Sequence, residues 1–476
     1  MHYHKKTAFW LMSAGMAFSL CFGAVQAQET ADPAKEQAPL VRINKDPYPS
    51  TYKPFPSQMT AIVGATILDG TGRQIEGGTI LMDEGKIVAV GHDLDIPVGA
   101  KVIDAQGKWV TPGIIDVHSH LGVYPAPDVK STADGNEATS PVTAKVWAEH
   151  SVWPQDTGFS RALAGGITTL QILPGSANLI GGRGVTLKNV PARTVEAMKF
   201  PGAPYGLKMA CGENPKRVYG NKGGPSTRMA NMAGYREAWI KAKEYKAKWD
   251  KYYADYDAGK NPTPPARDLE METLVGVLEG EVLIHNHCYR ADEMVSMINM
   301  AKEFGYKIST FHHAVESYKI ADILAEEGIC SAMWADWWGF KLEAFDGINE
   351  NIPMVAKAGA CAIVHSDSDI GIQRLNQELA KAWADGRKAG IEFTKAEAFT
   401  WLTSKPAEAL GIADQTGTLE SGKMADVVVW SGDPFSTYSV AEKVYIDGAL
   451  MYDRHNPDLY PQSDFELGQN RKGDHQ

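Results

Sequence analysis

Histidines stand at the ends of several short apolar segments of this chain. Of its 13 histidines, seven close or directly follow a run with the composition of a buried strand: His118, His120, His285, His287, His312, His313 and His365. Asp367 comes two residues after the last of them. Imidazole nitrogens and carboxylate oxygens are the usual ligands of zinc and of related divalent ions. One His-x-His pair alone could serve packing, but four such segments together predict a metal centre.

The elements that must position these side chains lie in the middle of the chain, residues 113–408. There, continuously apolar runs such as GEVLIHNH and KISTFHHA alternate with amphipathic stretches, a pattern typical of buried parallel strands joined by helices. In such βα folds the carboxyl ends of the strands carry the active site. Residues 229–267 differ, since they are charged, aromatic and mostly helical, and they predict an inserted surface helix.

Shorter β segments flank this region on both sides. Residues 59–112 and 409–456 contain alternating apolar runs punctuated by Gly and Asp-Gly, which indicates antiparallel strands. We therefore expect a small β-sandwich domain built from both ends of the chain.

Two motifs at the borders of the middle region are similar to those of a known family. The segment VTPGIIDVHSHLG carries His118 and His120, and GTLESGKMADVVVW returns the chain to the C-terminal β segments. From residue 60 to 455 the chain resembles the amidohydrolase superfamily, especially its imidazolonepropionase-like and prolidase-like metal-dependent hydrolases. The resemblance implies an α/β fold, a TIM-like (β/α)8 barrel with a small β-sandwich domain, which holds one or two divalent metal ions at its mouth.

The resemblance also implies which side chains hold the metal, with zinc as the expected ion and iron or manganese as alternatives. The ligands carried over by motif are His118, His120, His287, His313 and Asp367. A ligand on the fourth barrel strand stays open in GLKMACGENP: Lys208, which prolidase-like relatives carboxylate, or Glu213, which deacetylase-like relatives use directly. Glu213 is the preferred of the two. The ligand spacings suit barrel units of about 30 residues, apart from an excess before His287 that matches the predicted inserted helix.

The same residues predict hydrolysis of a carbon–nitrogen bond in an amide, cyclic amide or dipeptide. A metal lowers the pKa of a bound water to about 7, and Asp367 is the candidate to take its proton and pass it to the leaving group. The metal, or a nearby histidine such as His285 or His312, would polarise the substrate carbonyl. Deaminase and imidazolonepropionase relatives keep a Glu where this chain has Arg290, so those two activities are less expected. The alternative is a non-catalytic metal- or ligand-binding protein on a degenerate amidohydrolase barrel.

Candidates for substrate recognition follow other predicted strands. Arg183 in the Gly-rich loop GSANLIGGRG, and Arg217 and Tyr219 in ENPKRVYG, are candidates to bind a substrate carboxylate. Three tryptophans suit either an apolar pocket wall or an aromatic core layer: Trp334, Trp337 and Trp338. The expected substrate is a small amide or a peptide-like molecule.

Composition limits the remaining classes of protein. The 476 residues are 44% hydrophobic and carry a formal net charge of −11, which describes an acidic globular chain. Such a charge argues against nucleic acid as a partner, because nucleic-acid binding requires clustered basic residues. It also disfavours adhesion to anionic membranes, and it leaves a homo-oligomer open.

The N-terminus predicts an exported protein. Residues 1–27 begin with a short basic stretch that contains Lys5 and Lys6, continue through an apolar stretch and end on small residues, as signal peptides do. Residues 28–58 are interpreted as an extended arm and residues 457–476 as a polar tail. The mature chain would have no stable membrane anchor and would be periplasmic in a Gram-negative bacterium. Its cysteines lie in apolar runs that favour buried thiols over disulfides: Cys211, Cys288, Cys330 and Cys361.

Overall fold

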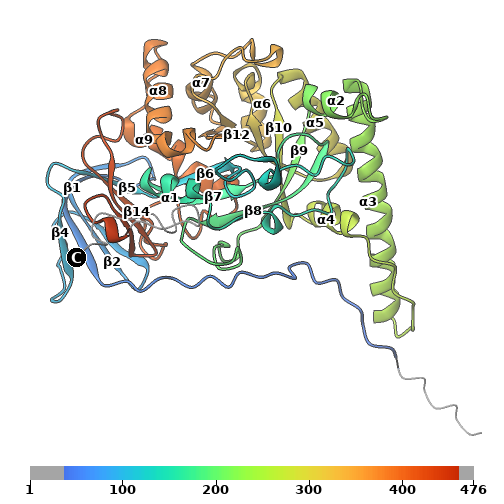
Figure 1. Ribbon diagram of the computed structural model, residues 1–476, viewed down its shortest axis with the longest axis horizontal. Coiled ribbons are helices and arrows are strands. Elements are labelled where there is room, and N and C mark those ends of the chain that lie inside the picture. The colour runs from blue at the N-terminus through green and yellow to red at the C-terminus, as the bar shows by residue number, and fades with distance from the viewer. Residues whose placement is uncertain (1–36, 460–476) are drawn as a thin grey trace, which may run out of the picture.

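A computed structural model describes residues 37–459 of the chain, and Figure 1 shows how its elements are arranged. The predicted signal peptide lies outside the described residues, as do the start of the arm and residues 460–476 of the predicted tail. The described strands form two sheets of eight strands each. Within residues 37–459, no helix is long and apolar enough to cross a membrane.

The sheet in the middle of the chain is barrel-like and carries the histidines. Its strands are neighbours in chain order: β6 (Ile114–Ser119), β7 (Ile167–Ile172), β8 (Ile180–Lys188), β9 (Tyr205–Ala210), β10 (Val282–Cys288), β11 (Ile308–His313), β12 (Cys330–Met333) and β13 (Cys361–Val364). The backbone N–H of Asp367, just after β13, donates to the carbonyl of His118 on β6 at 3.0 Å. This nearly closed sheet confirms the expectation of a TIM-barrel-like α/β fold.

Strand β8 departs from the expected run of parallel strands. It pairs antiparallel with both β7 and β9, whereas the other neighbours in this sheet are parallel. The short link 173–179 explains the reversal, because a parallel crossover needs a dozen or more residues and an antiparallel return does not. The segment 175–184, predicted to be a loop, therefore already contains the first half of β8.

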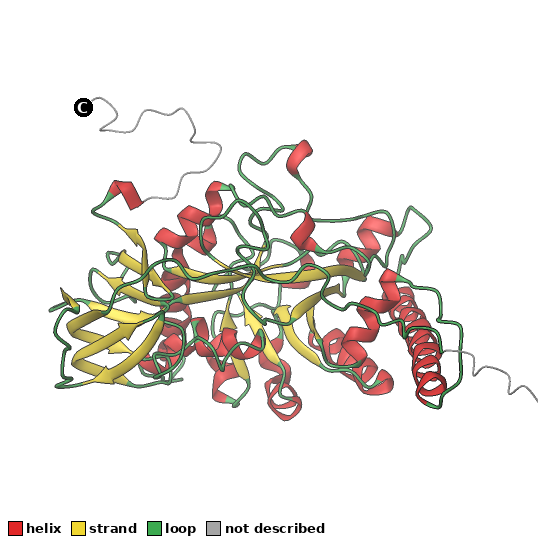
Figure 2. Ribbon diagram, turned by 90° about the horizontal axis from the view of Figure 1, so that it is seen from below, coloured by secondary structure: helices red, strands yellow, loops and turns green. Residues whose placement is uncertain are grey.

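Helices follow the barrel strands and lie on the outer side of the sheet, as Figures 1 and 2 show. They are α1 (Thr157–Ala164), α2 (Glu213–Tyr219), α3 (Arg228–Asp257), α4 (Leu269–Leu278), α5 (Ala291–Phe304), α6 (Ala321–Glu327), α7 (Asn351–Lys357), α8 (Leu375–Lys388), α9 (Lys395–Phe399) and α10 (Ser404–Ala409). The long helix α3 occupies most of the segment 229–267. Its N-cap is Thr227, and it buries one stripe that includes Tyr235, Trp239 and Trp249, so one of its faces belongs to the core.

The second sheet joins the two ends of the described chain. Its strands are β1 (Thr60–Leu68), β2 (Gln74–Asp83), β3 (Lys86–Gly91), β4 (Lys101–Asp104), β5 (Trp109–Pro112), β14 (Val427–Trp430), β15 (Ala441–Ile446) and β16 (Ala449–Asp453). Strand β14 pairs antiparallel with β5, which brings the C-terminal strands beside the N-terminal ones. All eight strands are connected in one sheet, and the division into two packed layers of a sandwich stays a prediction.

A buried ion network fastens this sheet to the barrel. The ammonium group of Lys188, at the end of β8, lies 3.2 Å from a carboxylate oxygen of Asp426 and 2.8 Å from one of Asp447. Asp426 precedes β14, Asp447 follows β15, and all three side chains are buried. From the arm, the hydroxyl of Tyr52 donates to Asp447. The network therefore links the barrel, the second sheet and the arm at one point.

Two disulfides correct the expectation of buried thiols. Cys211, after β9, is bonded to Cys288 at the end of β10, and Cys330 on β12 is bonded to Cys361 on β13. Each bond joins neighbouring strands; Cys330 and Cys361 are direct partners in the strand register. Each cysteine lies 31 or 77 residues from its partner, so only the pairing of the strands brings the sulfurs together.

We predict that Lys188→Met lowers the free energy of unfolding by about 3 to 5 kcal/mol, because it leaves the two carboxylates buried without their cation. Chemical denaturation of the full chain measures the change. The matched control is Lys388→Met. The ammonium group of Lys388 pairs with Asp385 on the surface, so its loss is expected to leave the free energy of unfolding almost unchanged. Equal effects of the two substitutions would contradict the role given to the network.

Candidate metal centre

Side chains from three strand ends converge at the mouth of the barrel. Asp367, after β13, places Oδ1 at 3.3 Å from Nε2 of His118 and at 3.1 Å from Nε2 of His120. Its Oδ2 lies 3.7 Å from Nδ1 of His313 at the end of β11. One atom each from His118, His313 and Asp367 lie within 4.8 Å of one another. The distances of 3.3 and 3.7 Å from the Asp367 oxygens to His118 and His313 suit ligands that each stand about 2 Å from one ion.

Two of these side chains, those of His313 and Asp367, extend from residues with an uncommon backbone conformation. His313 has φ 69° and Asp367 has φ 50°, in the left-handed region that residues other than Gly rarely adopt. Asp116 supports this geometry: its Oδ1 accepts hydrogen bonds from the backbone N–H groups of His118 and Ser366, both at 3.2 Å. Its Oδ2 accepts a hydrogen bond from the Ser366 hydroxyl. Strained backbone persists where the surrounding contacts determine it, and it is concentrated at functional sites.

The electrostatic environment leaves neutral imidazoles beside an ionised carboxylate. Burial lowers the pKa of His118 and of His313 well below the ordinary histidine value, and nearby positive charge lowers it further. Burial alone would raise the pKa of Asp367, but the hydrogen bond from His120 and the surrounding positive charge lower it. A metal ligand must be deprotonated to bind, so these protonation states suit a cation.

Lys208, rather than Glu213, reaches the cluster from β9. Its Nζ lies 3.3 Å from Nε2 of His118 and donates to the carbonyl of Pro174 at 3.0 Å. Burial lowers the pKa of Lys208 to about 8, so its amine is more readily modified than that of an exposed lysine. Glu213, at the start of α2, has its carboxylate 3.7 Å from the ammonium group of Lys341. The geometry therefore reverses the preference for Glu213 and favours Lys208.

A buried nitrogen without a partner supports a metal at this position. Nδ1 of His287 is buried and has no hydrogen-bond partner among the described residues, whereas buried polar atoms normally have one. The ring of His365, also buried, interacts with the backbone of Met333. Both rings adjoin His313: Nε2 of His365 lies 3.0 Å from its Nδ1, and the ring of His287 meets it edge-on at 4.5 Å. This set of nitrogen and oxygen donors fits a divalent ion such as zinc, iron or manganese.

His285 and His312 lie beneath the cluster, inside the barrel. Both are fully buried. Nδ1 of His312 lies 2.9 Å from Nδ1 of His118, and its Nε2 lies 2.9 Å from Nδ1 of His285. Nε2 of His285 then meets the side-chain amide of Gln171 at 3.2 Å. Because both ring nitrogens of each histidine contact another side chain, the geometry favours orientation of His118. His312 also forms a possible metal-binding group with His118 and His365, and polarisation of a substrate carbonyl by His285 or His312 stays a prediction.

Aromatic rings and one cation line the open side of the cluster. Trp334 stacks on His313 with 4.3 Å between ring centroids, and Trp337 stacks on Trp334 at 4.8 Å. Trp334 is buried, whereas Trp337 is 41% exposed, so the stack runs from the cluster to the surface. The Lys341 ammonium group lies 3.9 Å from the centre of the Tyr289 ring. Trp334 and Trp337 therefore form a wall beside the site, while Trp338 donates farther out to the carbonyl of Phe345.

Of the three residues predicted to bind substrate, Arg217 alone lies near this mouth. It is exposed on α2, and its positive charge acts on Tyr289, whose pKa is raised mainly by burial, and on Lys341, whose pKa is lowered mainly by burial. Tyr219 is only 2% exposed, and its hydroxyl accepts a hydrogen bond from Asn178 at 2.8 Å. That tyrosine is therefore a core residue and does not face a substrate.

Arg183 points away from the cluster. On β8 it is the register partner of Leu207, while its neighbour Gly182 is the partner of Lys208. Successive side chains of a strand point to opposite faces, so Arg183 projects to the outer face of the barrel. Its Nε donates there to the hydroxyl of Thr273 at 2.9 Å. The prediction that Arg183 binds substrate at the metal centre is corrected by this placement.

Several residues at the site were not among the predicted site residues. They are Asp116, Gln171, Asn214, Tyr289 and Lys341, while His365 was counted among the strand-end histidines without an assigned role. Asp116 could have been found, because it lies inside the motif that carries His118 and His120. His365 had the same signal as the other strand-end histidines. Asn214 lies in the first turn of α2, with its Nδ2 3.4 Å from Nε2 of His287, and Lys341 lies in the loop after β12. The sequence carries no signal that brings either residue to the site.

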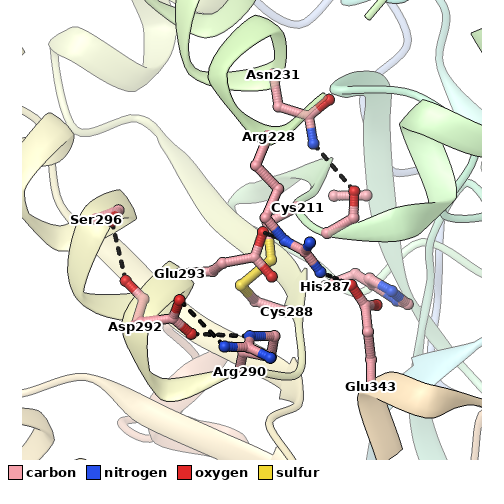
Figure 3. The surroundings of a disulfide bond; sticks show 12 residues. Cys211, Arg228, Asn231, His287, Cys288, Arg290, Asp292, Glu293, Ser296 and Glu343 are labelled. Carbon is pink, nitrogen blue, oxygen red and sulfur yellow. Dashed lines mark hydrogen bonds and ion pairs between the residues drawn. A yellow bond between two sulfur atoms is a disulfide. The ribbon is translucent and has the colours of Figure 1, made fainter. Parts of the chain in front are cut away.

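The disulfide between Cys211 and Cys288 lies next to His287 (Figure 3). Cys288 directly follows His287, and Figure 3 shows the bond beside the helix that begins at Arg228. Arg228 pairs with Glu293 and with Glu343, both at 2.7 Å. These contacts tie the ends of β9 and β10 to the loop that follows β12, and so fix the position of His287.

Comparisons with known proteins identify similar chains. The model of the amidohydrolase family matches residues 109–459. The amidohydrolase tasK of Hapsidospora irregularis is 31% identical over 79% of this chain, which spans 40% of the length of tasK. An imidazolonepropionase of Rhizobium rhizogenes is 25% identical over 78% of this chain and 89% of its own length. The crystal structure of an amidohydrolase from Thermotoga maritima MSB8 is 37% identical, covers 83% of this chain and 100% of its own, and superposes with a TM-score of 0.76.

We predict that Lys208→Met removes most of the metal from the purified protein, whereas Glu213→Gln leaves the metal content unchanged. The reason is that Lys208 contacts His118 and the Glu213 carboxylate lies beside Lys341 instead. Elemental analysis of the purified full chain measures the metal per protein. Loss of metal in Glu213→Gln with full retention in Lys208→Met would restore the assignment of Glu213.

Proposed function

Because this chain belongs to the amidohydrolase family, whose model spans most of its length, we propose that it is a metal-dependent hydrolase of carbon–nitrogen bonds. One observation carries this proposal above the others. His118, His313 and Asp367 come together at the mouth of the barrel with ligand atoms within 4.8 Å, although they are far apart along the chain. Members of this fold carry their active sites at that end of the barrel.

The residues suggest a division of labour in hydrolysis. His118, His120, His287 and His313, with Asp367 and with Lys208 in carboxylated form, would hold the divalent ion. A bound ion of this kind lowers the pKa of water and polarises a carbonyl group. Asp367 is suited to take a proton from the attacking water, because its carboxylate is ionised and partly open to the site. The water oxygen bonds to the carbonyl carbon, the carbon–nitrogen bond breaks, and Asp367 passes the proton to the leaving nitrogen.

The mouth of the barrel supports a small amide that carries an apolar group and a carboxylate, such as an N-acyl amino acid or a dipeptide. Trp337 offers an exposed ring next to the cluster, which suits the apolar group. Arg217 and Lys341 are cations at the same mouth, and both suit a carboxylate. No hydrogen bond or ion pair of Arg217 to another described residue is found, so it is free to bind one.

Deamination receives less support from the chain. Arg290 stands where deaminase and imidazolonepropionase relatives would need an acid, and its guanidinium pairs with Asp292 at 3.0 Å. An arginine cannot donate and accept a proton at neutral pH as a glutamate does. The sequence similarity to the imidazolonepropionase of Rhizobium rhizogenes therefore does not imply that this chain has imidazolonepropionase activity.

We also propose that the protein is exported and, in a Gram-negative bacterium, periplasmic. The two disulfides support this, because such bonds persist in oxidising compartments and are rare in the cytosol. The composition of residues 1–27 supports it as well.

We expect Asp367→Asn to reduce kcat by about 100-fold to 10,000-fold, the range typical of general acid–base groups, on whichever substrate a panel of N-acyl amino acids and dipeptides identifies. Circular dichroism should show that the variant stays folded. Asp369→Asn, at an exposed position two residues further on, is the control and should keep full activity. Full activity of Asp367→Asn, or a metal-loaded wild type that hydrolyses no carbon–nitrogen bond, would refute the proposed reaction.

Export has its own test. Expression of the full chain in a Gram-negative host, followed by N-terminal sequencing of the periplasmic fraction, should yield a protein that begins at Gln28. An uncleaved chain that remains in the cytosol would contradict the proposal.

A further inference from the structure

A large cavity lies on the outer side of the barrel, apart from the metal centre. Its volume is about 900 Å3, within the size range of small-molecule sites. The arm forms one wall through residues 42–48, and α3, α4 and the start of β9 form others. None of the strand-end histidines of the metal centre lines it. Val282, which does, precedes His287 on β10 by five residues, or roughly 16 Å along a strand.

Arg183 is an unusual group in the wall of this cavity. It is only 5% exposed, yet no carboxylate among the described residues lies within ion-pair distance of its guanidinium. Its Nε donates to Thr273 at 2.9 Å, and its Nη1 approaches the carbonyl of Lys45 at 3.4 Å. Glu149 and Glu272 act on it only at longer range. A buried charge is costly unless it is paired. An anion bound in the cavity would supply the missing partner of the Arg183 guanidinium.

Most of the other cations of the cavity are already paired, and the two without an ion pair among the described residues, Arg42 and Lys145, are exposed. Lys199 lies 2.8 Å from Glu149, Lys45 contacts two acidic side chains, and Arg267 pairs with Glu272 at 2.8 Å. Basic side chains nevertheless outnumber acidic ones in the lining, seven to five, although the whole chain has 47 basic and 58 acidic residues. The cavity therefore has the opposite charge balance to the rest of the protein, which favours an anionic occupant.

Flat aromatic surfaces surround the unpaired guanidinium. The carbon Cζ of Arg183 lies 4.2 Å from the centre of the Trp147 ring and 5.4 Å from that of Tyr205. Tyr48 of the arm meets Trp147 edge-on with 6.1 Å between centroids, and Tyr253 of α3 also lines the cavity. Planar rings bind well between such walls, and a guanidinium binds a carboxylate through two parallel hydrogen bonds.

We propose that this cavity is a second ligand site, which binds a small aromatic carboxylate with its carboxylate on Arg183 and its ring between the aromatic walls. The site is separate from the metal centre and does not depend on the reaction proposed there. Because residues 42–48 form one wall, the ligand would also be enclosed by the arm.

The test is isothermal titration of the full chain with 2-naphthoate and with its neutral analogue 2-naphthalenemethanol. The wild type should bind the carboxylate saturably, and the alcohol at least about tenfold more weakly, which corresponds to about 1.4 kcal/mol. Arg183→Met should weaken naphthoate about tenfold and leave the alcohol nearly unchanged. Arg193→Met, at an exposed position, is the matched control and should bind like the wild type.

Two further measurements separate the cavity from the metal centre and do not rely on the arginine variant folding. Val275→Trp, on the α4 wall, should block both probes by filling the space. A crystal of the wild type soaked in naphthoate should show the ring in the cavity with its carboxylate on Arg183. The absence of saturable binding, a ring at the mouth near Arg217, or unchanged affinity in Val275→Trp would each overturn the proposal.

Discussion

The carboxylate of Asp367 is the group on which the candidate metal centre depends. It is the described side chain that lies within 4 Å of His118, of His120 and of His313, and its own backbone N–H closes the barrel against β6. Its conformation has φ 50°, which the hydrogen bonds of Asp116 to the adjoining loop help to hold. The closure of the sheet and the geometry of the site thus both depend on Asp367. A change that opens the junction between β13 and β6 would disturb both.

Around this carboxylate, burial is the main factor that sets the protonation states of the histidines. The inner histidines form a chain from Gln171 through His285 and His312 to His118, and burial lowers the pKa of His285 to about 3. These imidazoles stay neutral at physiological pH, so their nitrogens are available as ligands or as hydrogen-bond partners. The second sheet, held to the barrel through Lys188, and the two disulfides keep the strand ends in register. The scaffold therefore supplies a rigid, preorganised site.

Local motifs predicted the parts of the site that depend on strand position alone. His118, His120, His313 and Asp367 come at strand ends, and a strand end is visible in composition. The direction of β8 could not be predicted from composition, because it depends on the length of the single loop that precedes this strand. The roles of His285 and Arg183 depend on which face of its strand each side chain occupies. Arg183 was expected to bind substrate, but on β8 it projects to the outer face of the barrel. Disulfides between neighbouring strands, such as Cys211 with Cys288, likewise required the strand order before they could be predicted.

The most direct measurement of a metal-dependent centre is a crystal structure of the full chain with anomalous data collected at the zinc, iron and manganese edges. We expect a peak about 2 Å from ligand atoms of His118, His313 and Asp367, with the edge identifying the ion. A peak bound elsewhere in the chain, or protein saturated with each ion that shows none between these three side chains, would contradict the assignment of the metal centre.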